Sequence, residues 1–132
     1  MKKVKLVIIA VFGLILGTRA DEETDHLSPL THRLLLSVEA TRHGERGPGK
    51  LFNFAADPNQ EFKEEHKLTR KGVFSQYANG LAIRELFDKH KGFLKAEYDP
   101  DEIYVQTTWK ERTIESAKAQ LDGLYGNNEF LD

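Results

Sequence analysis

Two short apolar runs, each followed by a loop and a helix-like segment, constrain the fold of this chain more than any other feature. Residues 34–40 (LLLSVEA) form a run short enough for a strand buried on both faces, and residues 103–107 (IYVQT) are β-rich. A helix is expected after each run. The order strand, loop, helix, turn, strand, helix is typical of an α/β fold built on a parallel sheet.

The first expected helix runs from Thr69, whose hydroxyl can cap it, to about Phe87 or His90. Gly72 and Gly80 weaken the prediction slightly, because each costs up to ~1 kcal/mol against alanine inside a helix. Its apolar face is predicted at helical spacing by Val73, Phe74, Tyr77 and Leu81.

The second expected helix has stronger end signals. Thr108 and Glu111 form a Thr-x-x-Glu capping-box pattern, and Gly126 is well placed to end the helix. An apolar face recurs at steps of three and four residues, at Ile114, Ala117, Leu121 and Leu124. Between the two helices, residues 98–102 (YDPDE) predict a turn.

The N-terminus has the pattern of a secretory signal peptide. Residues 1–20 join a short basic start, an apolar run over residues 6–16 and small residues up to Ala20. Eleven apolar residues are too few to cross a hydrocarbon core of ~30 Å, so a membrane anchor is a weaker alternative, and a buried core helix is weaker still. We therefore expect a signal peptide at 1–20 and a domain at 21–132, secreted or lysosomal, without membrane contact after processing.

Composition excludes several classes of site. The chain has no cysteine, which rules out disulfides, thiolate nucleophiles and cysteine-based zinc sites. A formal charge of −2 argues against a nucleic-acid partner. Removal of residues 1–20 would take away four bases and no acid and would leave −6. A protein this acidic must gather positive charge locally if it handles anions.

Positively charged residues follow each predicted strand, at the edge of a parallel sheet where ligands bind. Arg42, His43 and Arg46 lie within five positions, and Gly44 allows the backbone to approach a ligand. Guanidinium groups match phosphate oxygens, and histidine is a competent nucleophile. Arg112 lies in the first turn of the second helix, where a bound anion would offset its conflict with the helix dipole. A solvated surface histidine and a surface arginine are the alternative interpretations.

Three motifs in order resemble the histidine acid phosphatases, the branch-2 histidine phosphatases. Arg42–Pro48 is similar to the family's Arg-His-Gly-x-Arg-x-Pro signature, Leu68–Gly72 to its Leu-Thr-x-x-Gly helix start, and Ile103–Tyr125 to its second phosphate-binding segment. The resemblance covers residues 34–125 and implies the parallel-sheet, phosphoglycerate mutase-like fold of that family. It also implies that residues 21–132 are an N-terminal part of the domain, without the C-terminal part of the sheet.

Carried over by position, the resemblance makes His43 the nucleophile that becomes phosphohistidine, and Arg42, Arg46 and Arg112 the ligands of the phosphoryl group. It implies a phosphomonoester substrate, no metal and no cofactor. The family's later His-Asp pair, which supplies the proton donor, is not found, because no histidine here precedes an acid. General acids contribute about 10²–10⁴-fold in rate.

Three functions follow from this pattern. The leading one is acid phosphatase activity that needs a C-terminal half, and the alternative is a catalytically impaired phosphate-binding remnant of the family. A mutase or transferase of the wider superfamily is disfavoured by the signal peptide. A homodimer is one of the assemblies that we consider for this chain.

Overall fold

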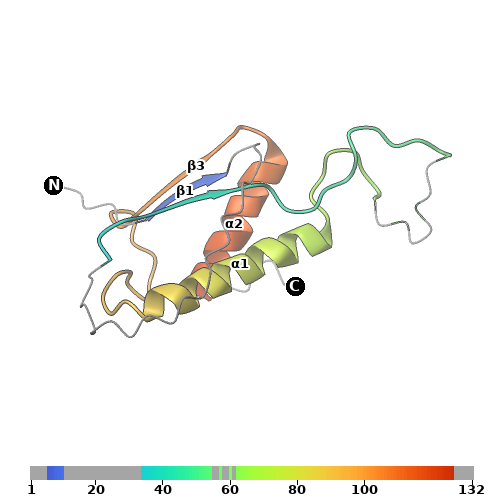
Figure 1. Ribbon diagram of the computed structural model, residues 1–132. Helices are drawn as coiled ribbons and strands as arrows, with labels where there is room; N and C mark the ends of the chain where they lie inside the picture. Colours follow the sequence, from blue (N-terminus) through green and yellow to red (C-terminus); the bar gives the residue numbers. More distant parts are fainter. Residues whose placement is uncertain (1–5, 11–33, 55–56, 58–59, 61, 127–132) are drawn as a thin grey trace, which may run out of the picture.

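The computed structural model describes residues 6–10, 34–54, 57, 60 and 62–126 (Figure 1). Its elements are β1 (Leu6–Ala10), β2 (Ser37–Thr41), α1 (Arg70–Asp88), β3 (Ile103–Thr107) and α2 (Glu111–Tyr125). The three strands form one parallel sheet in the order β2-β1-β3, and both helices lie on the same side of it. This confirms the predicted parallel α/β architecture. Neither α1 nor α2 is both long and apolar enough to cross a membrane.

The middle strand of the sheet comes from the segment that the sequence predicts to be a signal peptide. Leu6–Ala10 pairs with β2 on one side and β3 on the other. Leu6 is 0% exposed and Ile8 is 1% exposed, and both belong to the hydrophobic core with Phe87, Phe93, Leu94, Ile103 and Leu124. A strand was not among the alternatives for this segment. Residues 11–33, and with them the predicted cleavage point, lie outside the described part, so removal of the segment stays a prediction.

Among the described residues, the helices cover one face of the sheet and none of the elements covers the other. Ile8 stands in register with Glu39 and Val105 in a row that faces the helices. On the opposite face, Val38 is 61% exposed and Tyr104 is 51% exposed. The prediction that residues 34–40 are buried on both faces is therefore wrong. Burial alternates along β2 because this strand lies at the edge of the described sheet and has helices on one side only.

Helix α1 has the ends that the sequence predicts but a different buried face. The Thr69 hydroxyl accepts a hydrogen bond from the Gly72 amide at 3.0 Å, and the helix ends at Asp88. Phe74 and Leu81, both predicted on the apolar face, are about half exposed. The residues that α1 buries are Gly72, Gln76, Gly80 and Phe87.

The buried face of α1 follows from a close crossing with α2. A Cβ added at Gly80 would lie 2.1 Å from the Gln120 carbonyl oxygen, and one at Gly123 would lie 2.0 Å from the Tyr77 carbonyl oxygen. Only glycine, which has no Cβ, fits at such a crossing. The glycine that weakens α1 as an isolated helix therefore allows the two helix backbones to touch.

Helix α2 begins later than the capping-box pattern predicts. Its N-cap is Lys110, which makes no side-chain cap bond, so the prediction of a Thr108 cap is wrong. The Thr113 hydroxyl holds this turn instead, because it lies 2.6 Å from the Lys110 carbonyl and 2.9 Å from the Thr108 hydroxyl. The predicted end is confirmed, since Gly126 takes the left-handed conformation with φ 72°. Of the predicted apolar face, Ala117 and Leu124 are buried, whereas Ile114 is exposed.

Candidate active site

The two loops that carry the predicted site residues emerge from the same edge of the sheet. β2 ends at Thr41, directly before Arg42, and β3 ends at Thr107, four residues before α2 begins. Because the strands are parallel, both carboxyl ends lie at one edge, which is where ligands bind in open α/β sheets. The topology thus brings two segments about 70 residues apart in sequence to one place.

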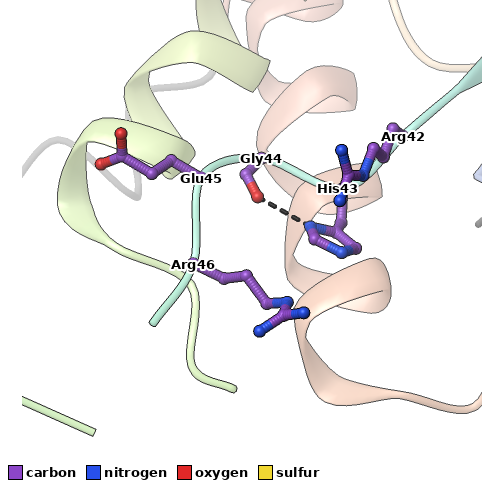
Figure 2. A pocket seen from close by; sticks show the side chains of 5 residues that line it. All are labelled: Arg42, His43, Gly44, Glu45 and Arg46. Carbon is purple, nitrogen blue, oxygen red and sulfur yellow. Dashed lines mark hydrogen bonds between the residues drawn. The ribbon is translucent and has the colours of Figure 1, made fainter. Parts of the chain in front are cut away.

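A pocket of about 370 Å³ lies in the first of these loops and is lined by residues 42–46. Figure 2 shows the His43 ring and the Arg46 guanidinium on the same side of the backbone, with Glu45 turned the other way. His43 is 7% exposed, so its imidazole is part of the wall and not a solvated surface group. The alternative of a solvated surface histidine is therefore wrong.

One hydrogen bond determines which nitrogen of His43 carries the proton. Nδ1 lies 2.8 Å from the carbonyl oxygen of Gly44, and a carbonyl only accepts, so Nδ1 carries the proton in the neutral ring (Figure 2). Nε2 then holds the lone pair. Burial lowers the pKa of His43 below its ordinary value, and the nearby charges of Arg112, Arg42 and Arg46 lower this pKa further, against the effect of the Gly44 bond. The ring therefore stays neutral at a more acid pH than an exposed histidine would.

The same electrostatic effects show that all three predicted arginines act on His43, although they line two pockets. Arg42 and Arg46 line the pocket of His43, whereas Arg112 lines a second pocket of about 340 Å³. Within the described ranges, Nε of Arg46 and Nε of Arg112 are buried without a hydrogen-bond partner. Buried N–H groups on converging cations are a costly arrangement unless an anion binds there.

The loop of Arg46 is held against the start of α1. Arg46 forms an antiparallel bridge with Leu68, and the Gly47 amide donates to the Lys67 carbonyl at 2.8 Å. A Cβ added at Gly44 would lie 2.4 Å from the carbonyl oxygen of Gly72. Gly44 therefore has a packing role that the sequence did not reveal, since any larger residue would push the loop away from α1.

Glu45 lines the pocket, but its carboxylate points away and is engaged elsewhere. One carboxylate oxygen accepts from the Thr69 hydroxyl at 2.9 Å, and the other lies 3.2 Å from the Lys71 ammonium. The Lys71 and Thr69 hydrogen bonds lower the pKa of Glu45. A carboxyl group that stays ionised and faces outward cannot give a proton to a ligand in this pocket.

Two polar side chains that sequence reasoning gave no role hold the backbone of the loop. The Gln76 amide donates to the carbonyl oxygen of Arg42 at 3.1 Å, and the Ser116 hydroxyl accepts from the Gly44 amide at 3.0 Å. Ser116 lies within residues 103–125, the segment that resembles the family's second phosphate-binding motif. No local pattern identifies such contacts, because each joins a helix to a loop that is distant in sequence.

The comparisons with known proteins agree with this geometry. The family model described as "Histidine phosphatase superfamily (branch 2)" matches residues 38–131, which is most of the chain. The chain belongs to the branch-2 histidine phosphatases. The matched range contains β2 except for its first residue, both helices, β3 and every residue of the site, whereas β1 lies before it.

Similar members of this family are acid phosphatases several times longer than this chain. Lysosomal acid phosphatase of Rattus norvegicus is 38% identical over 91 residues, which are 67% of this chain and 20% of that protein. Testicular acid phosphatase of Mus musculus is 35% identical over 98 residues, 70% of this chain and 22% of that protein. A probable acid phosphatase of Dictyostelium discoideum is 41% identical over 66 residues, half of this chain. The chain thus spans about a fifth of the length of its mammalian relatives.

Proposed function

We propose that this chain carries the phosphoryl-binding and nucleophilic part of an acid phosphatase, which hydrolyses phosphomonoesters through a phosphohistidine on His43. The observation that carries the proposal is the buried imidazole, with Nδ1 bound to the Gly44 carbonyl, among three arginines. Phosphoryl transfer needs positioning and charge stabilisation more than covalent help from the protein, and this arrangement supplies both.

The first step is attack of His43 Nε2 on the phosphorus of a monoester. A bond between Nε2 and phosphorus forms, the ester bond between phosphorus and oxygen breaks, and the alcohol oxygen leaves with the electron pair. Arg42, Arg46 and Arg112 bind the non-bridging oxygens, whose charge they balance as the phosphoryl group transfers. Water then attacks the phosphohistidine, which gives inorganic phosphate and the neutral imidazole again.

The leaving oxygen needs a proton, and the described residues that line the pocket do not offer one. Glu45 is the acidic residue that lines it, and its carboxylate is ionised and turned away. Aryl esters leave as weakly basic phenolates, whereas alkyl alkoxides depend on protonation. We therefore expect this chain to transfer phosphoryl groups from aryl esters far better than from alkyl esters.

Export belongs to the same proposal. The relatives include lysosomal acid phosphatases, and residues 1–20 have the composition of a signal peptide. We assign the protein to the secretory pathway, with the lysosome or the extracellular space as its destination. The homodimer stays a prediction, which light scattering on the purified chain can check.

A second candidate is a phosphate-binding protein without turnover. The observation that favours it is the lack of a proton donor in a pocket that nevertheless concentrates guanidinium groups. In that case His43 would act only as a ligand of the anion.

Hydrolysis and binding measured on one preparation separate the two candidates. The purified chain is assayed with p-nitrophenyl phosphate and glycerol phosphate, and its affinity for inorganic phosphate is measured by calorimetry, beside a His43→Asn variant. Turnover of the aryl ester alone, lost in His43→Asn, supports the phosphatase. Phosphate binding without turnover of either ester supports the binding protein, and absence of both binding and turnover would refute the site itself.

A further inference from the structure

A single buried hydroxyl connects the two loops of the site. Ser116 lies on α2 and is 0% exposed. Its Oγ accepts a hydrogen bond from the Gly44 amide at 3.0 Å and donates one to the Arg112 carbonyl at 2.6 Å. Gly44 in turn accepts the Nδ1 proton of His43 at 2.8 Å. The imidazole of His43 is thus linked to the backbone of Arg112 through the two hydrogen bonds of Ser116 and the covalent backbone of Gly44, whose amide and carbonyl belong to successive peptide groups.

The chemistry of this link requires a hydroxyl. Ser116 must donate and accept at once, and a serine hydroxyl has one donor proton and two acceptor lone pairs. The bond to Arg112 alone is an ordinary helix feature, because Ser75 on α1 makes the same bond to the carbonyl of Lys71, four residues earlier, at 2.8 Å. The bond that sets Ser116 apart is the one to Gly44, 72 residues away.

Gly44 is held from two sides, and Ser116 is one of them. On the side of α1, Gly44 packs so tightly on Gly72 that no Cβ would fit. On the side of α2, its amide is bound by Ser116. Without the hydroxyl, the amide of Gly44, next to the carbonyl that accepts the His43 proton, would lose its hydrogen bond to α2. The orientation of the imidazole would then no longer be tied to the position of Arg112.

We propose that Ser116 is a positioning residue, which keeps His43 in the form with the proton on Nδ1 and holds the Arg112 segment in register with the loop of residues 42–46. The proposal rests on the proposed function, because the tautomer of His43 that Ser116 preserves is the one in which Nε2 attacks phosphorus. Ser116 itself touches no reacting atom.

The size of the effect follows from the cost of a buried donor without an acceptor. Removal of one partner of a buried hydrogen bond shifts the equilibrium between the original loop conformation and alternative ones by a factor of roughly 5–150. If the loop must return to its original conformation before it binds an anion, the apparent affinity falls by up to the same factor. We expect Ser116→Ala to weaken binding of inorganic phosphate by about tenfold or more.

The experiment is nitrogen NMR on the full chain with labelled histidine and glycine. In the wild type we expect His43 to carry its proton on Nδ1 and the Gly44 amide to exchange slowly with solvent. In Ser116→Ala we expect faster exchange at Gly44, a larger share of the form with the proton on Nε2, and weaker phosphate binding. Ser75→Ala is the matched control, because it removes the same bond within a helix but no link to the loop, and all three readouts should stay at wild-type values.

Three results would overturn the proposal or separate it from the proposed function. A folded Ser116→Ala variant with an unchanged His43 proton position and unchanged phosphate affinity overturns it. If Ser116→Ala does not fold, the wild type decides, since rapid exchange of its Gly44 amide contradicts the bond and slow exchange supports it. If the wild type binds no phosphate, the proposed function fails, while the proton position of His43 in the two proteins still tests Ser116.

Discussion

Truncation of Ile8 to alanine tests whether the N-terminal segment is part of the fold. Ile8 is 1% exposed and sits in the middle of β1, with β2 and β3 on either side. Removal of a buried isoleucine side chain costs about 2–5 kcal/mol, because transfer energy is lost and a cavity remains. A small domain has a free energy of unfolding of about 5–15 kcal/mol, so this one change should remove a large part of it.

Urea unfolding followed by circular dichroism measures the effect. With a slope of about 1–3 kcal/mol per molar urea, the midpoint of Ile8→Ala should fall by about 1 M or more. Val7→Ala is the matched control, because Val7 is on the opposite, open face of the same strand, between the exposed residues Val38 and Tyr104. We expect this control to change the free energy of unfolding by about 1 kcal/mol or less.

Equal midpoints for the two variants and the wild type would refute the reasoning, because β1 would then add nothing to the core. The outcome also bears on the signal peptide. If Ile8→Ala destabilises the chain as predicted, removal of residues 1–20 takes the middle strand out of the sheet, and the processed protein needs another strand between β2 and β3. N-terminal sequencing of the exported protein shows which form exists.

Three further predictions concern the helix crossing and the site. Gly80→Ala should lower the free energy of unfolding by about 1–3 kcal/mol, because the new Cβ meets the Gln120 carbonyl at 2.1 Å. Alanine at exposed Asn79 is the control in the same urea assay. A higher free energy of unfolding in Gly80→Ala, as helix propensity alone predicts, would contradict the close helix crossing. The lowered pKa of His43 means that the unfolded chain binds this proton at a higher pH, so the free energy of unfolding should fall as the pH drops from about 6.5 towards the lower pKa of the folded state. NMR titration should show this lowered pKa and its rise when phosphate binds, and an ordinary value in the free protein would count against burial of the ring. Glu45→Gln should leave the rate of phosphoryl transfer from an aryl ester within about twofold in a rapid-quench assay, whereas a loss of about 10²–10⁴-fold would identify Glu45 as the proton donor after all.

Local sequence patterns predicted those parts of the fold that local physics determines. The Thr69 cap, the Gly126 end of α2 and the strand at 103–107 each depend on residues within one or two turns of the chain, and all are confirmed. The grouping of Arg42, His43 and Arg46 was equally visible, since these residues are adjacent in sequence and line one pocket.

The parts that were missed depend on contacts between distant segments. The apolar pattern of residues 6–10 is shared by a signal peptide and a buried strand, and only pairing with β2 and β3 tells the two apart. The buried face of α1 was mispredicted because apolar spacing does not reveal where a second helix crosses. At Gly80 and Gly123 that crossing selects for the absence of a side chain. Likewise, the role of Ser116 exists only once α2 lies against Gly44.

The central claim is that Nε2 of His43 is the nucleophile of a phosphoryl site built by Arg42, Arg46 and Arg112. The most direct test is phosphorus NMR on the chain after reaction with an aryl phosphate and rapid denaturation, with the modified residue located by mass spectrometry. We predict a phosphohistidine at His43, with phosphorus on Nε2, because Nδ1 is occupied by the Gly44 carbonyl. No phosphohistidine in a chain that binds phosphate, or phosphorus on Nδ1 of His43, would contradict the account.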